Sequence, residues 1–328
     1  MGPSTAIAGK RQPHEHFAID PSTIWPVRSA RTLVPVMTPR NALLAIHLGA
    51  LMFGLSGVLG KLADSPALII TFGRALFAVL TLLLVAQLLK PSGALPDWRQ
   101  RGRLALGGLL LGAHWLTFFI AVKIAGVGIA TLGFASFPAF TVLLEGVLFR
   151  ERTRAVEFTM VGLVCAGLLL VAPTFDLDSA PTAGLLYGVL SGLLFALLSL
   201  LNRAVTRGLD PVHSALWQNL AVFACLLPWS WRGLPAVPAP DWLWLALLGI
   251  LCTGLAHSLF VASLRVLKAR TTSVIFALEP VYGIAFAWWL FNEQPTLRML
   301  LGGAMIIVAS IVTSRLKSPP GAVAKLAS

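Results

Sequence analysis

The sequence carries little charge for its length. Only 12% of its 328 residues are Asp, Glu, Lys or Arg, whereas a soluble domain usually carries about 25%. The charges that do occur lie between long apolar stretches, and 57% of all residues are hydrophobic. A stretch of about 20 apolar residues is long enough to cross a hydrocarbon layer about 30 Å thick as a helix. This composition excludes a soluble globular domain and predicts a membrane protein.

Cysteines and the motifs of soluble enzymes are also scarce. The three cysteines, Cys165, Cys225 and Cys252, lie in apolar stretches and lack the CxxC spacing of a metal or redox site. The sequence has no Walker A motif and no paired metal ligands. We therefore expect no enzymatic activity, no cofactor and no metal. A membrane-embedded enzyme is the less favoured alternative, because it needs a cluster of carboxylates or histidines at one membrane face.

The basic residues indicate how the chain is oriented rather than a nucleic-acid partner. The formal net charge is +12, but the basic residues stand singly or in small groups in short loops. Twenty of them fall on the side of the membrane that holds both termini and four on the other, with Arg74 inside a span. Because cytoplasmic loops are enriched in Lys and Arg, we expect a multi-pass protein of the bacterial inner membrane with both termini in the cytoplasm.

The apolar stretches predict an all-α membrane protein with ten transmembrane helices. A Pro- and charge-containing segment, residues 1–40, is expected to be a disordered cytoplasmic tail, within which Met37 is an alternative start. Residues 316–328 form a second cytoplasmic tail. The spans are expected at 41–62, 66–90, 103–122, 126–149 and 155–173 in a first half, 41–173, and at 182–202, 211–230, 241–264, 271–291 and 297–315 in a second half, 182–315.

The two halves resemble each other at an offset of 142 residues. Residues 104–153 align with 246–295 without a gap and share 11 identities in 50 positions, among them Pro138 with Pro280. Because each half has an odd number of predicted spans, five, the second half enters the membrane upside down relative to the first. Inverted repeats of this kind are a property of many alternating-access transporters.

Three motifs carry a family resemblance. They are Arg74 in TFGRALFA, the stretch SFPAFTVLLEGVLFRE at 136–151, and the stretch ALEPVYGIAFAWWLFNE at 277–293. With these motifs in this order, the sequence resembles the EamA branch of the drug/metabolite transporter superfamily over nearly all of the chain after residue 40. The resemblance implies a ten-helix bundle with a central cavity, cytoplasmic termini, and often export of amino acids or related metabolites.

Ionisable side chains inside the spans are candidates for the transport site, because a charge in the membrane costs about 2.5–3.5 kcal/mol on insertion scales. Arg74 could attract a substrate carboxylate, or could form a structural ion pair. Glu279 precedes Pro280, and Pro138 occupies the equivalent place in the first half. Proline-interrupted spans at matching positions indicate a transporter's central site, although a packing kink is the alternative. Glu145 is a weaker candidate, which could pair with a loop base.

Histidines, aromatic rings and amides complete the candidate site. His114 and His257 lie at nearly symmetric places and suit proton coupling, since histidine has an ordinary pKa of about 6.5; a neutral, hydrogen-bonded histidine is the alternative. His47 is expected to be structural. Further substrate-binding candidates inside the spans are Trp115, Tyr187, Trp217, Gln218, Asn219 and Tyr282.

Two other groups of residues are expected to be structural. Glu151 and Glu293 follow predicted hairpins, where each could stabilise the start of the following helix. Small residues suit close contact between helices, namely Gly54, Gly57 and Gly60 in the first span and Gly107, Gly108 and Gly112 in the third.

The sequence thus predicts a secondary transporter that exports amino acids or related small metabolites by alternating access, with proton coupling as one option. The alternative is efflux of drugs or lipophilic cations by the same fold. The expected partners are a small-molecule substrate and the lipid bilayer, and no nucleic acid. Substrate identity, transport direction, coupling ion and oligomeric state are not specified by these residues.

Overall fold

The computed structural model describes most of the chain from Thr38 to Arg315. The described residues are 38–89, 96–148, 154–172, 176, 178–205, 209–264, 266–267, 271 and 275–315. Residues 1–37 and 316–328 lie outside this set. The predicted tails therefore fall almost wholly outside the described residues, as does Met37.

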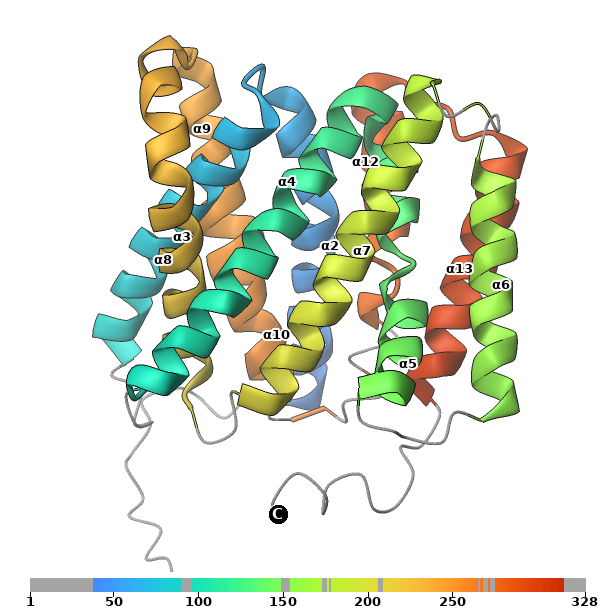
Figure 1. Ribbon diagram of the computed structural model, residues 1–328, viewed down its shortest axis with the longest axis horizontal. Helices are drawn as coiled ribbons and strands as arrows, with labels where there is room; N and C mark the ends of the chain where they lie inside the picture. The colour runs from blue at the N-terminus through green and yellow to red at the C-terminus, as the bar shows by residue number, and fades with distance from the viewer. Residues whose placement is uncertain are drawn as a thin grey trace, which may run out of the picture. The chain divides into compact units, whose positions relative to one another are not determined.

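Helices account for nearly all of the described residues, among which no β-strand occurs. Figure 1 shows them side by side and running roughly along one direction. The α-helices are α2 (Pro39–Leu62), α3 (Ala67–Leu89), α4 (Trp98–Phe134), α5 (Phe137–Leu148), α6 (Ala155–Val171), α7 (Ala180–Val205), α8 (Pro211–Ser230), α9 (Ala239–Gly249), α10 (Ala256–Leu264), α12 (Glu279–Phe291) and α13 (Leu297–Arg315), joined by a 3-10 helix, η1 (Trp231–Ala236), and a π-helix, η2 (Ile250–Leu255).

The helices run between two ends of the bundle, at the bottom and the top of Figure 1. At the bottom, α2, α4 and α8 begin and α5, α7 and α13 end. We call it the Arg203 end, after a residue in the last turn of α7. At the top, α2 and α12 end and α9 begins. We call it the Lys61 end, after a residue in the last turn of α2.

Local sequence signals set where several helices begin. The Thr38 hydroxyl accepts a hydrogen bond from the amide three residues later (3.2 Å) at the start of α2. Asp97 and Gln100 form a capping box at the start of α4. Asp210 accepts from the amide two residues later (2.8 Å), directly before Pro211 opens α8. Each cap satisfies a backbone N–H that a helix start leaves without a partner.

Five of the described helical segments are long and apolar enough to span a bilayer, judged by length and composition. They are Pro39–Leu62, Ala67–Leu88, Trp98–Phe134, Ala180–Val205 and Ala239–Phe260. Shorter apolar helices are Phe137–Leu148, Ala155–Val171 and Leu297–Thr313. These agree in place with the predicted spans, because runs of apolar residues dominate the sequence. Phe137–Leu148 is short because the helix is broken just before it.

Two predicted spans are broken directly before a proline. Between α4 and α5 the helix is interrupted at Ala135 and Ser136, and Pro138 is the second residue of α5. Pro280 is likewise the second residue of α12. Proline has no N–H to donate and its ring collides with the carbonyl four residues earlier. The span predicted at 126–149 is therefore not one continuous helix.

Gly126 turns the chain within α4. Its backbone angles, φ 84° and ψ 171°, are non-helical, so that α4 consists of two helical segments. A φ in this range favours glycine. The turn falls at the first residue of the predicted span 126–149, directly after the predicted connection from span 103–122. The part of the ninth predicted span that the structure describes begins at residue 275, apart from the single residue 271.

Glycines allow α2 and α4 to approach their neighbours closely, which confirms their predicted role. A Cβ atom on Gly54 would lie 2.9 Å from the Cβ of Tyr282 on α12. A Cβ atom on Gly60 would lie 2.4 Å from the Phe119 ring on α4. Similar close approaches are made by Gly57 on α2, and by Gly107, Gly108 and Gly112 on α4 against α8.

Candidate substrate cavity

A cavity of about 610 Å³ lies among the helices and receives side chains from both halves of the chain. Its lining is largely apolar and rich in aromatic rings. The Phe134 ring stacks on Phe137 and meets Phe195 edge-on, with ring centroids 5.4 Å apart in both pairs. The Phe and Trp side chains of the lining are Phe53, Trp115, Phe118, Phe134, Phe137, Phe195, Phe260 and Phe276. Such a lining suits a ligand with a sizeable apolar part.

Most of the residues that the sequence singles out as substrate-binding candidates meet at this cavity. Those that line it are Arg74, His114, Trp115, Pro138, Gln218, Asn219, His257, Glu279 and Pro280. They come from α3, α4, α5, α8, α10 and α12, so that residues far apart in the sequence face one space.

Three predicted candidates do not line the cavity. Tyr187 on α7 is 38% exposed. The Trp217 ring lies under the guanidinium of Arg101, with 5.1 Å between the guanidinium carbon and the ring centre. The Tyr282 hydroxyl lies 3.1 Å from Nδ1 of His47. A position inside a predicted span does not fix which face of the helix a side chain occupies, and these three face elsewhere.

Arg74 is a buried cation at the cavity wall, with 4% of its surface exposed. Its Nε donates to Thr253 Oγ1 (2.9 Å), and its Nη2 donates to the carbonyl oxygen of Cys252 (3.4 Å). The guanidinium carbon lies 4.1 Å from the centre of the Trp115 ring, within cation–π range. Among the described residues, no carboxylate lies within ion-pair distance of it. A buried charge without a counter-ion is costly, which favours an anionic ligand here.

Glu279 places a carboxyl group on the same cavity. It is the first residue of α12, where the helix dipole favours a negative charge. No ion-pair partner for Glu279 occurs in the part of the chain that the structure describes, although it lies within electrostatic range of Arg74. The break before Pro280 sets this helix start at the cavity. Opposite charges therefore line one apolar space without pairing directly.

The two cavity histidines differ in their contacts. Nδ1 of His114 lies 2.7 Å from Ser191 Oγ, and the Ser191 hydroxyl in turn donates to the His114 carbonyl oxygen (3.1 Å). His114 is thus hydrogen-bonded to a serine, as its structural interpretation requires. His257 on α10 lines the cavity, and among the described residues its ring makes no hydrogen bond.

Polar side chains continue the cavity toward the Arg203 end. Gln218 Nε2 donates to Asn202 Oδ1 (2.6 Å), and both residues line the cavity. Glu145, also in the lining, forms an ion pair with Arg203. The pairing of Glu145 with a basic residue near a loop was one of the two sequence interpretations. Asn219 Nδ2 donates to the Ala215 carbonyl oxygen (2.9 Å) in its own helix.

Equivalent positions of the two halves both contribute to the cavity lining. Nine pairs of lining residues are separated by the same 142 positions that relate the two halves in sequence. The pairs are Phe53 and Phe195, Ser56 and Leu198, Leu111 and Thr253, Trp115 and His257, Phe118 and Phe260, Phe134 and Phe276, Ala135 and Ala277, Phe137 and Glu279, and Pro138 and Pro280. Residues at equivalent positions of the internal repeat therefore form much of the cavity lining.

The family comparison matches the same division of the chain. The model of the EamA-like transporter family matches residues 40–172 and residues 182–315, once in each half. The chain belongs to the EamA-like transporter family. It is accordingly a multi-pass membrane protein of a transporter family, and the resemblance inferred from the three motifs is confirmed.

Individual relatives of this EamA-like transporter cover most of its length. An uncharacterized transporter of Archaeoglobus fulgidus is 27% identical over 83% of this chain and 95% of its own. The pseudopaline exporter CntI of Pseudomonas aeruginosa is 26% identical over 85% of this chain and 97% of its own. An S-adenosylmethionine uptake transporter of Rickettsia bellii is 29% identical over 63% of this chain and 70% of its own.

A solved crystal structure also resembles this EamA-like transporter, with a TM-score of 0.58 at 18% identity. The match covers 83% of this chain and 96% of that chain. At this level of identity the similarity concerns the fold alone.

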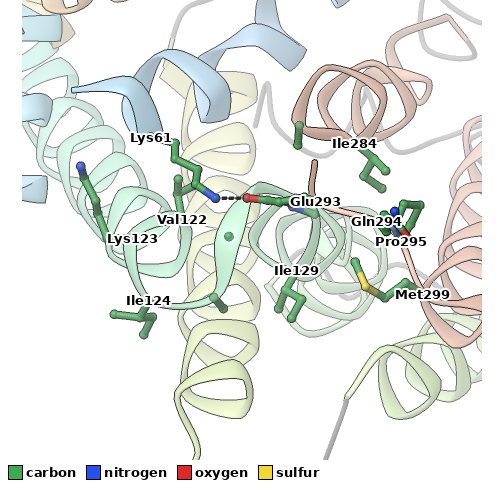
Figure 2. Close-up of a pocket in the computed structure, with 14 residues that line it drawn as sticks. Lys61, Val122, Lys123, Ile124, Ile129, Ile284, Glu293, Gln294, Pro295 and Met299 are labelled. Carbon is green, nitrogen blue, oxygen red and sulfur yellow. Dashed lines mark hydrogen bonds and ion pairs between the residues drawn. The ribbon is translucent and has the colours of Figure 1, made fainter. Parts of the chain in front are cut away.

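At the Lys61 end of this EamA-like transporter, an ion pair lies beside the Gly126 turn. Figure 2 shows Lys61 and Glu293 pointing toward each other beside a surface pocket of about 620 Å³. The Glu293 carboxylate also accepts from the backbone N–H of Val127 (3.1 Å), at the start of the second segment of α4. Glu293 was expected to stabilise the following helix, α13. That expectation is wrong, because the chain folds the carboxylate back onto α4. Glu151 lies outside the described residues.

A buried acid, which the sequence analysis missed, holds the α2–α3 connection at the Lys61 end. Asp241 at the start of α9 is 2% exposed. It accepts from the backbone N–H of Ser65 (2.7 Å), from the Ser65 hydroxyl (2.5 Å) and from the N–H of Asp64 (3.1 Å). The Lys123 ammonium donates to the Ala63 carbonyl oxygen nearby. Asp241 is the first residue of the predicted span 241–264, and an acid at the end of a span is ordinary, so nothing in the sequence marks it.

Thr253 is the second residue that the sequence analysis missed. It lines the cavity and contacts Arg74 directly. Threonine is common in membrane helices, so residue type alone carries no signal. The repeat offers one signal, because Thr253 is equivalent to Leu111 at the offset of 142 and is the polar member of that pair.

Proposed function

We propose that this chain is a secondary transporter of the bacterial inner membrane that exports amino acids or related small metabolites. The observation that carries the proposal is the pair of opposite charges, Arg74 and Glu279, on one largely apolar cavity. A zwitterion would place its carboxylate at the guanidinium and its ammonium at the carboxylate, and its side chain would contact the aromatic rings. Buried charges that lack partners of their own are the groups a ligand of complementary charge would satisfy.

Alternating access between two inverted halves of five spans, ten in all, is the proposed mechanism. Three observations support it: the cavity lining is paired at an offset of 142 residues, the cavity extends to the Arg203 end through Glu145 and Asn202, and an ion pair closes the Lys61 end. The distribution of basic residues favours a cytoplasmic Arg203 end and cytoplasmic termini. The structure then corresponds to a state that is open toward the cytoplasm.

Direction and coupling are part of the proposal rather than of the family assignment. One relative is named an exporter and another an uptake transporter, so membership does not decide direction. We propose export because the inferred state would load substrate from the cytoplasm. Glu279 and His257 have no hydrogen-bond or ion-pair partner among the described residues and line the cavity. They are the proposed proton-sensitive groups, and His114 is a less favoured candidate because it is hydrogen-bonded to Ser191.

Efflux of lipophilic cations is the second candidate. Glu279 together with the aromatic lining favours it, because aromatic faces and a carboxylate bind cations. Arg74 argues against it, since a second cation in the same cavity would repel such a substrate. The zwitterion satisfies both charges and is therefore preferred.

The test is uptake of a radiolabelled amino-acid panel, including leucine, by proteoliposomes with and without a pH gradient. Saturable uptake supports the proposal. Arg74→Gln and Glu279→Gln are each expected to lower transport efficiency about 100-fold, because removing one partner of a buried charge pair costs about 2–5 kcal/mol. Arg101→Gln and Glu157→Gln change the same residue types outside the cavity and should transport normally. Unchanged transport by both cavity variants at several pH values would refute the zwitterion site.

If no amino acid is transported by folded protein, lipophilic cations become the next panel. Transport of such cations that depends on Glu279 and improves in Arg74→Gln would establish the second candidate instead.

A further inference from the structure

Helix α3 and the π-helix η2 meet in backbone contact next to Arg74. A Cβ atom on Gly249 would lie 2.7 Å from the carbonyl oxygen of Arg74, and one on Gly254 would lie 2.5 Å from Cγ2 of Thr81. Both distances are too short for a side chain to fit without movement. Gly249 at the end of α9 and Gly254 in η2 therefore allow this part of the chain to lie close to α3, and Thr253, between them in the sequence, contacts the Arg74 side chain.

The Thr253 hydroxyl has a fixed orientation at this contact. It donates to the carbonyl oxygen of Leu248 (3.1 Å), five residues earlier. A hydroxyl has one hydrogen and two lone pairs, so its hydrogen is used and a lone pair remains to accept from Arg74 Nε (2.9 Å). A single π-turn inside an α-helix is rare and is frequent at functional sites.

These contacts leave one edge of the guanidinium facing the cavity. Nε is bonded to Thr253, one face lies against Trp115 at 4.1 Å, and one Nη2 donor reaches the Cys252 carbonyl. Nη1 makes no hydrogen bond among the described residues, and Arg74 lines the cavity. Two N–H groups from the two Nη atoms match the two oxygens of a carboxylate.

We propose that Thr253 is a positioning residue for carboxylate recognition: it fixes the Arg74 guanidinium against Trp115 so that the Nη edge meets the substrate. The inference rests on the proposed function, in which Arg74 binds the carboxylate. Packing alone does not require a hydroxyl at this place, because the equivalent residue of the first half, Leu111, lines the same cavity. Of these two equivalent residues, only Thr253 carries a hydroxyl, and it is the one that accepts from Arg74 Nε.

The experiment compares leucine with isoamylamine, which is leucine without its carboxylate. In proteoliposomes, Thr253→Val is expected to raise the KM for leucine about tenfold, because hydrogen bonds to charged groups are among the stronger ones. It should leave the maximal rate of leucine transport and the inhibition of that transport by isoamylamine within about twofold, because the amine does not contact the guanidinium. Thr253→Ser keeps the hydroxyl and should restore the leucine KM.

Thr81→Val is the matched control. Thr81 lies on α3 at the same contact with η2, and its hydroxyl donates to the Phe77 carbonyl oxygen of its own helix rather than to Arg74. It makes the same chemical change without touching the guanidinium, so both KM and inhibition should stay unchanged. If Thr253→Val is not recovered as folded protein, Thr253→Ala removes the hydroxyl without adding a methyl group in its place.

A second measurement does not depend on transport. The difference between emission spectra of the parent and the Trp115→Phe protein isolates Trp115, and this difference should shift in a Thr253→Val background as the guanidinium leaves the ring. An unchanged Trp115 spectrum overturns the positioning role. So does a KM rise that leucine and isoamylamine share equally. If Arg74→Gln leaves leucine transport intact, the proposed function fails instead, whatever the Trp115 spectrum shows.

Discussion

Removing the Glu293 carboxylate should open the Lys61 end of the transporter. Glu293 pairs with Lys61 at the end of α2 and accepts from the N–H of Val127 at the Gly126 turn. One side chain thus joins α2, the segment after α12, and the second part of α4. In the proposed alternating-access mechanism, this end opens as α2 separates from α12 and α4, and both contacts then break. We therefore expect Glu293 variants to shift the population toward the state open at the Lys61 end.

The size of this shift follows from the exposure of the groups. The Lys61 and Glu293 side chains are 33% and 24% exposed, so solvent screens the pair and limits its contribution to about 1 kcal/mol. The bonds from Val127 (3.1 Å) and Gly128 (3.5 Å) are made by a carboxylate at a helix start and add about 1–2 kcal/mol. Glu293→Ala loses both and should shift the equilibrium roughly 30- to 150-fold. Glu293→Gln keeps an acceptor for Val127 and should shift it about tenfold or less.

The assay measures access to the cavity from the side of the Lys61 end. Ser56→Cys places a thiol in the cavity lining, in a background where Cys165 and Cys225 are replaced by serine and Cys252 by alanine. The rate of labelling by a membrane-impermeant maleimide should rise in the order parent, Glu293→Gln, Glu293→Ala. Arg298→Gln removes a charge from the same end. Arg298 forms no ion pair with any other described residue, so its labelling rate should match the parent.

A charge exchange separates the two contributions. The double variant Lys61→Glu with Glu293→Lys restores the ion pair but presents an ammonium to the N–H of Val127, which cannot accept a hydrogen bond. Its labelling rate should therefore stay above that of the parent. Full restoration of the parent rate would refute the contribution of the Gly126 turn. Equal labelling in all Glu293 variants and the parent would refute the closure as a whole.

Two further predictions concern stability. Asp241→Ala leaves the N–H groups of Asp64 and Ser65 and the Ser65 hydroxyl without their acceptor. The loss should destabilise the protein by about 3 kcal/mol and lower its melting temperature in detergent by roughly 5–10 °C. A decrease below about 1 °C would contradict the assigned hydrogen bonds. Gly60→Ala puts a Cβ atom 2.4 Å from the Phe119 ring and should destabilise by about 1–3 kcal/mol. Gly162→Ala, where nothing lies within 4 Å, should be neutral or slightly stabilising in the same melting experiment.

The sequence predicts the helices of this fold well, because residues close to each helix end determine where the helix begins and ends. Apolar runs end at charged or capping residues, and the helix start at residue 211 and the helix end at residue 230 agree with the structure. Internal breaks are harder to place. Pro138 and Pro280 mark two of them by their missing N–H groups, whereas the π-helix within the predicted span 241–264 leaves no comparable mark.

Some of the residues that line the cavity are predicted because of the cost of placing a charge in lipid, rather than from signals at helix ends. A charged or histidine side chain in an apolar span is too costly to face lipid, so Arg74 and Glu279 had to face the interior. Tyrosine has no such constraint, and Tyr187 faces away from the cavity. Contacts between helices distant in sequence, such as Lys61 with Glu293, depend on the packing of α2 against α12 and are not visible in either segment alone.

The repeat explains why the polar groups of the cavity are distributed unequally. Duplication gives both halves the same cavity-lining positions, but at three of them an apolar residue of the first half is equivalent to a polar residue of the second. These pairs are Leu111 and Thr253, Trp115 and His257, and Phe137 and Glu279. A symmetric cavity would carry two carboxylates close together, which repel each other in an apolar space. The other acid of the lining, Glu145, pairs with Arg203. Phe137 at the position equivalent to Glu279 therefore leaves Glu279 as the one lining acid without an ion-pair partner among the described residues, which is the acid that the proposed zwitterion site sets against Arg74.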